Sequence, residues 1–124
     1  MGTDAGELAE WANEAIEILG RFVPVFGRIT RGGSSVPAFV ASADELQAMA
    51  RDARRWSESH PCPRPPADRH FAAMLDAIEN MPTVIFRAVA EDTPAGLVKK
   101  RIGELSKAFV RHGEKLEEIC QRGS

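Results

Sequence analysis

Residues 4–29, DAGELAEWANEAIEILGRFVPVFGRI, decide the fold class of this chain. Apolar side chains recur along the segment at alternating spacings of four and three residues: Leu8, Ala12, Ala15, Leu19, Phe22, Phe26 and Ile29. This spacing marks one face of an α-helix. Trp11, Ile18 and Val25 widen the stripe beyond the seam of a coiled coil, which predicts a core-facing helix of a globular bundle.

Pro24 lies well inside this helical segment. Proline lacks a backbone N–H and clashes with the preceding turn, so we expect a kink or a split between Gly20 and Pro24. A flexible loop is then predicted from Thr30 to Val36, because residues 32–35 are glycines and serines.

A second helix is predicted to begin at Ser42-Ala43-Asp44-Glu45, where Ser42 and Glu45 have the spacing of a capping box. A short turn at Pro37–Ala41 is an alternative addition before it. We expect it to end near residues 57–59, because His60 precedes Pro61 and is disfavoured in the α conformation. Its predicted inner face is Leu46, Met49, Ala50, Ala53 and Trp56.

A third helix is predicted after Pro65-Pro66, with a kink at Pro82. Its apolar stripe is Phe71, Met74, Leu75, Ile78, Met81, Ile85, Ala88 and Val89. A fourth helix is predicted with Thr93 as N-cap and Pro94 at its first position. Its stripe is Val98, Ile102, Leu105, Phe109, His112, Leu116 and Ile119.

No stretch alternates apolar and polar residues as a half-buried strand does, so the predicted fold class is all-α. The connections between the second, third and fourth helices are short, which favours antiparallel neighbours. We therefore predict one domain spanning residues 1–124. Its expected architecture is an antiparallel up-down-up-down four-helix bundle with Pro-kinked first and third helices.

Composition narrows the classes of function. Of 124 residues, 44% are apolar and 27% charged, which is typical of a soluble folded domain. The formal charge of −2 counts against a nucleic-acid binder.

No apolar run approaches the ~18 residues of a membrane span. No signal-peptide pattern is present, so we expect a cytoplasmic protein with reduced thiols.

Candidate site residues converge at one end of the predicted bundle. His60, Cys62, His70 and Cys120 supply the nitrogen and sulfur ligands that zinc prefers. Their spacing contains neither Cys-x-x-Cys nor His-x-x-x-His, so the bland alternative is a rigid proline-rich connector with solvent-facing histidines. Cys62 and Cys120 are also a candidate disulfide pair. The alternative is two reduced thiols, which a cytoplasmic location favours.

His112 lies on the apolar seam of the fourth helix, where it is either a half-buried polar residue or a ligand. A di-iron centre requires Glu-x-x-His pairs, and neither His70 nor His112 has a glutamate three residues before it. Haem needs only one axial histidine and stays an alternative, but we expect no cofactor. No catalytic constellation or phosphate-binding loop is recognisable, so an enzyme is less expected than a binding protein.

Three hypotheses for function remain. The first is a non-enzymatic protein-interaction or regulatory module that contacts a protein partner or a second copy of itself, suggested by the wide stripe of residues 4–29. The second is a metal-binding or thiol-redox sensor at the Cys/His end. The third is a carrier of a small apolar ligand, with Met49, Met74 and Met81 lining its pocket.

Overall fold

The computed structural model describes residues 3–31 and 36–122, and every regular element in these residues is helical. The elements are α1 (Thr3–Gly20), α2 (Val23–Arg31), the 3₁₀ turn η1 (Val36–Phe39), α3 (Val40–Ser59), α4 (Pro65–Glu91) and α5 (Ala95–Arg122). The predicted all-α fold class is confirmed. The loop predicted from Thr30 to Val36 is wrong at both ends, because α2 continues through Arg31 and η1 begins at Val36. Its residues 32–35 lie outside the described residues.

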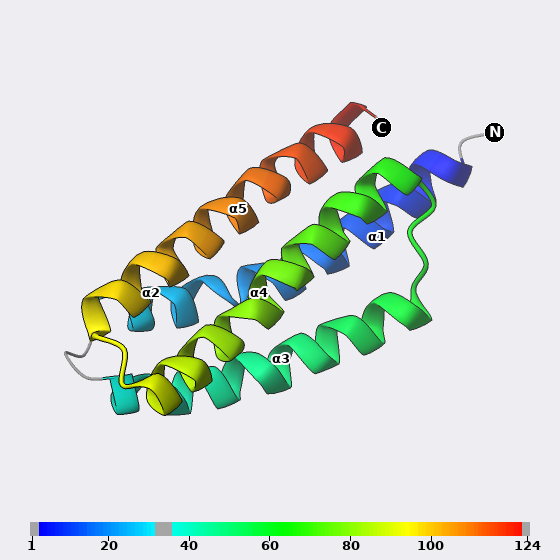
Figure 1. Ribbon diagram of the computed structural model, residues 1–124. Helices are drawn as coiled ribbons and strands as arrows, with labels where there is room; N and C mark the ends of the chain where they lie inside the picture. The colour runs from blue at the N-terminus through cyan, green and yellow to red at the C-terminus, as the bar shows by residue number, and fades with distance from the viewer. Residues whose placement is uncertain (1–2, 32–35, 123–124) are drawn as a thin grey trace.

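From α2 onward, helices that are consecutive in the chain pack together, and α5 also packs against α1 and α2. Helix α4 packs along both α3 and α5, whereas α2 contacts α3 and α5, and α1 contacts α5. Figure 1 shows α4 running back along α3, and α5 running back along α4. The two chain ends and the connection between α3 and α4 lie at the same end of the molecule (Figure 1).

Pro24 splits the first helical segment into α1 and α2, as predicted. Because Pro24 cannot donate a hydrogen bond to the carbonyl of Gly20, the ladder of α1 stops there. The carbonyl of Phe22 then accepts the N–H groups of Val25 and Phe26 at 3.0 and 3.1 Å, and α2 begins. By contrast, α4 continues without interruption through Pro82.

The predicted start of the second helix is wrong. Helix α3 begins at Val40, so Ser42 lies inside it, and the N-cap residue Phe39 makes no side-chain capping bond. The turn η1 leads directly into α3 and buries the side chains of Val36 and Phe39, which the capping-box pattern does not take into account. Glu45 instead accepts a hydrogen bond from Arg28 of α2 at 2.8 Å.

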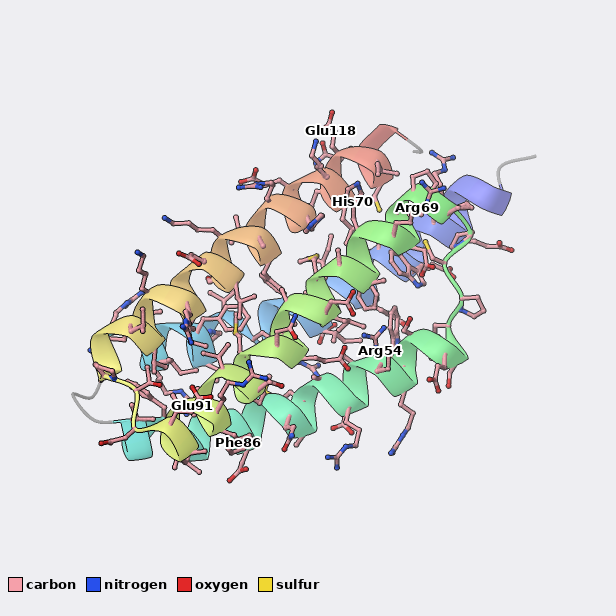
Figure 2. The ribbon with its side chains drawn as sticks, viewed as in Figure 1. Arg54, Arg69, His70, Phe86, Glu91 and Glu118 are labelled. Atoms are coloured by element: carbon pink, nitrogen blue, oxygen red, sulfur yellow. The ribbon has the colours of Figure 1, made fainter. Side chains whose placement is uncertain are left out.

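The core is apolar throughout the residues whose burial is described, and no polar or charged residue among them is buried. Polar contacts therefore lie at the periphery. Arg54 of α3 pairs there with Asp76 and Glu79 of α4. Figure 2 shows Arg54 on the side of α3 that faces α4. These two carboxylates raise the pKa of Arg54, and the hydrogen bond that Arg54 donates to Glu79 is the largest cause. No described helix is long and apolar enough to cross a membrane.

A tight turn joins α4 to α5. Asp92 adopts a left-handed conformation with φ 55° and ψ 43°, and the N–H of Thr93 bonds back to the carbonyl of Ala88 at 2.9 Å. This is the bond that closes a helix C-terminus in a Schellman-type turn, where glycine is usual. Helix α5 begins at Ala95, one residue later than predicted, and the carbonyl of Pro94 accepts its first hydrogen bonds.

We predict that Asp92→Gly stabilises the protein by about 0.5–1 kcal/mol, because glycine has no Cβ to strain in the left-handed conformation. Urea unfolding followed by circular dichroism measures the change. Asp92→Ala is the matched control, because it removes the same carboxylate but keeps the Cβ. It should be about 1 kcal/mol less stable than Asp92→Gly. Equal stability of the two variants would show that the charge of Asp92, not its backbone conformation, matters.

Candidate functional site

Three large aromatic side chains from three helices form a cluster near the end of the molecule that carries the chain ends. The rings of Trp11 and Phe71 lie 5.3 Å apart, those of Trp11 and Trp56 5.9 Å, and those of Trp56 and Phe71 5.7 Å. His60 stacks on Trp56 with a centroid distance of 4.9 Å. Offset and edge-to-face pairs of this kind stabilise a cluster beyond its burial alone, so the three helices are held together at this end.

Both indole N–H groups have partners. Nε1 of Trp11 donates to the carbonyl of His60 at 2.9 Å, and Nε1 of Trp56 donates to Glu14 at 3.1 Å. The first bond ties α1 to the backbone of the α3–α4 connection. Trp11 and Trp56 therefore have structural partners that account for their positions.

The two thiols are free and half-buried against the same apolar core. Sγ of Cys62 donates a hydrogen bond to the carbonyl of Arg64 at 3.2 Å. Burial raises the pKa of both Cys62 and Cys120, while the positive charge of Arg64 acts in the opposite direction on each. Thiols with a raised pKa carry little thiolate at neutral pH and are poor nucleophiles.

His70 of α4 and His112 of α5 meet across the helix pair, with their Nδ1 atoms 3.0 Å apart. Their ring centroids are 5.3 Å apart and the planes are tilted by 37°. Figure 2 shows His70 where α4 faces α5. Burial lowers the pKa of His70, and the charges of His112, Lys115 and Arg69 lower it further. One ring must donate and the other accept, so the contact requires at least one neutral imidazole.

The structure thus divides the four predicted metal ligands. His60 is exposed, stacked on Trp56, and its Nδ1 lies 3.0 Å from the carbonyl of Trp56. Cys62 and Cys120 lie against the core, and His70 turns to His112. Within residues 3–31 and 36–122, no group of three or more His, Cys, Asp or Glu side chains is placed to hold a metal ion.

The apolar pattern puts His70 and His112 on separate helices and does not pair them. The feature of the sequence that could predict their contact is the distance of each residue from the turn between α4 and α5. His70 lies 21 residues before Glu91, and His112 lies 17 residues after Ala95. In an antiparallel helix pair these positions fall within about one helical turn of each other.

A second feature is an open apolar groove between α5 and the junction of α1 with α2. Its volume is about 230 Å³. The residues lining it are Ile16, Leu19, Gly20, Val23, Met74, Phe109, Val110, Gly113, Glu114, Leu116 and Glu117. Three of the side chains at this groove are unusually exposed for large apolar residues: Ile16 at 39%, Val23 at 53% and Val110 at 49%. Val110 lies outside the apolar stripe that the sequence predicts for the fourth helix. The groove therefore becomes evident only from the packing of α5 against α1.

The raised pKa of both thiols predicts slow modification. At pH 7, Cys62 and Cys120 should react several-fold more slowly with a disulfide reagent than they do in unfolded protein, because the thiolate is the reacting species. Stopped-flow absorbance measures the rates. Cys62→Ser assigns the two phases. A folded protein that reacts as fast as the unfolded one would contradict the burial of these thiols.

The lowered pKa of His70 predicts that the protein loses stability in acid. The folded state binds a proton at His70 less readily than the unfolded state, whose value is about 6.5. The stability that neutral His70 contributes to the folded protein is therefore fully present above pH 6.5. It is lost as the pH falls through the folded-state pKa of His70. Melting temperatures between pH 5 and 8 measure it. His70→Gln should flatten the acid slope; a slope equal to that of the unmodified protein would contradict the assignment.

Compared with known proteins, the chain matches no protein family model, no curated protein and no solved structure.

Proposed function

We propose that this protein is a non-enzymatic interaction module that binds an amphipathic helix of a partner protein in the groove between α1, α2 and α5. The observation that carries the proposal is the grouping of exposed apolar side chains. Among side chains with described burial, five large apolar ones are exposed, and Ile16, Val23 and Val110 of these lie at the groove. Clustered exposed apolar residues mark binding surfaces more often than scattered ones do.

Two glycines line the groove. Gly20 lies at the end of α1, and a Cβ added there would meet no atom within 4 Å, so the space above it is open. On α5, a Cβ at Gly113 would lie 2.9 Å from Cε of Met74, so the glycine lets this side chain reach the helix backbone. Met74 is flexible and polarisable, and such side chains adapt well to an apolar ligand surface. An apolar ridge of a partner helix fits this shape.

The charge at the groove indicates the chemistry of the occupant. Glu114 and Glu117 on α5 are exposed and line its edge. A partner helix with basic residues beside its apolar stripe would complement them. A second copy that docked through the same groove would bring its own Glu114 and Glu117 to this acidic edge. Like charges at close approach disfavour that arrangement.

The proposal includes the finer architecture expected from the sequence. In it, α1 and α2 together form the first helix of an antiparallel up-down-up-down bundle, followed by α3, α4 and α5. The short turn at Asp92 supports the antiparallel relation of α4 and α5. We also place the protein in the cytoplasm, where a reducing environment would keep Cys62 and Cys120 as thiols.

The carrier hypothesis has less support. The three methionines expected to line the pocket do not share a cavity. Met74 lines the groove, Met49 lines a separate pocket between α1 and α3, and Met81 is fully buried. The thiol-sensor hypothesis is weakened by the raised pKa of both cysteines.

The test uses labelled helical peptides that share one apolar stripe and differ only in flanking residues, which are basic, neutral or acidic. Fluorescence anisotropy measures their affinity for the protein. We expect the basic peptide to bind most tightly. The double variant Ile16→Gln/Val110→Gln should weaken its binding by about tenfold or more, since a loss of 1.4 kcal/mol has that effect. Glu114→Gln/Glu117→Gln should remove the preference for basic flanks.

Val89→Gln/Leu97→Gln is the matched control, because these side chains are 45% and 40% exposed but lie outside the groove. It should bind the basic peptide like the unmodified protein. Failure of every peptide to bind, or equal loss of affinity in the control variant, would overturn the proposal. Sedimentation equilibrium adds a further outcome: a dimer abolished by Ile16→Gln/Val110→Gln would mean that a second copy occupies the groove instead.

A further inference from the structure

The contact between His70 and His112 brings two imidazole nitrogens from different helices within 3.0 Å of each other. Both side chains are half-buried, so each is fixed by its helix and still borders solvent. The contact joins α4 to α5, the two longest helices. Neither the aromatic cluster nor the groove uses these rings, and nothing in the proposed interaction with a helix requires them.

The spacing of the two nitrogens suits adjacent ligands of one metal ion. Imidazole nitrogens bind zinc at about 2.0–2.1 Å, so two of them lie about 2.9 Å apart at a right angle and about 3.4 Å apart at a tetrahedral angle. The observed separation of the two Nδ1 atoms is 3.0 Å. A metal ion can therefore replace the hydrogen bond if each ring turns by roughly 35–45°, so that lone pairs now aimed at each other converge on the ion. The χ2 torsion of histidine is broad and allows such a turn.

We propose that His70 and His112 form a two-imidazole site for a divalent d-block ion such as Ni²⁺, Zn²⁺ or Cu²⁺, which bridges α4 and α5. Water completes the coordination, because the described residues offer no group of three or more protein ligands. Imidazole suits these ions, whereas Mg²⁺ and Ca²⁺ prefer oxygen. Lys115 and Arg69 lie near His70 and disfavour a cation. The site should consequently bind more weakly than a closed structural zinc site.

Binding changes the tautomer of one ring and leaves the proton count unaltered. In the neutral pair one Nδ1 carries the proton and the other accepts it. For both Nδ1 atoms to bind the metal, the donor ring must move its proton to Nε2, through solvent. Each nitrogen then gives its lone pair to the ion, and no oxidant or reductant takes part.

The first experiment is a calorimetric titration of untagged protein with Ni²⁺ at pH 7.5. Nickel is the probe because Cu²⁺ also oxidises thiols, and this chain has two. We expect one site. His70→Gln and His112→Gln should each weaken binding by about tenfold or more, since chelation needs both rings. The double variant should lose little more than either single variant. His60→Gln, which changes the third histidine, is the matched control and should bind like the unmodified protein.

A second measurement identifies the ligating atoms. The ¹⁵N resonances of the histidine rings, recorded with and without Zn²⁺, should shift at Nδ1 of His70 and His112 and not at His60. Circular dichroism of each variant establishes that it is folded. Ni²⁺ affinity unchanged in both His70→Gln and His112→Gln would overturn the proposal. Loss of binding in His60→Gln, with His60 as the ring that shifts, would do so too and would return the metal to the predicted Cys/His set.

Discussion

The missing N–H of Pro24 is the constraint on which the rest of this structure depends. Because the carbonyl of Gly20 cannot be bonded from Pro24, α1 stops and a new helix starts from the carbonyl of Phe22. The turn places Phe22 in the core, where its ring lies 6.5 Å from that of Phe109 on α5. The same turn leaves Gly20 and Val23 beside α5 at the groove. If the helix were unbroken, it would run straight past this point. The residues at the junction of α1 and α2 would then not form one side of the groove.

Helix α5 links the two candidate sites. Val110, Gly113 and Glu117 face the junction of α1 and α2, and His112, next to Gly113, meets His70 of α4. Met74 is one turn after His70 and reaches the backbone of α5 at Gly113. The groove and the histidine contact are therefore built on the same stretch of the α4–α5 interface. The turn at Asp92 sets which residues of the two helices meet there.

The sequence predicts helices well and contacts between them poorly, for a physical reason. The period of apolar residues, the split at Pro24 and the helix end before Pro61 are local effects of backbone geometry, and each is found in the structure. The capping-box pattern at Ser42 failed because burial of Val36 and Phe39 extends the helix start toward the N-terminus. Residues such as His112 and Val110 acquire their partners from a helix far away in the sequence. Their positions depend on axial register, which the apolar period does not specify.

Polar contacts at the helix edges act together with the turn at Asp92 and the packed core to favour one register. Burial of apolar surface is non-directional, so the buried area does not by itself specify how far one helix is shifted along another. Here three pairs of consecutive helices have a directional contact at their edges. Arg28 of α2 bonds Glu45 of α3, Arg54 of α3 pairs with two carboxylates of α4, and His70 of α4 meets His112 of α5. Each exposed ion pair contributes little stability, at most about 1 kcal/mol. A slip by one turn would nevertheless separate every one of these partners by about 5.4 Å, so together they favour the observed alignment.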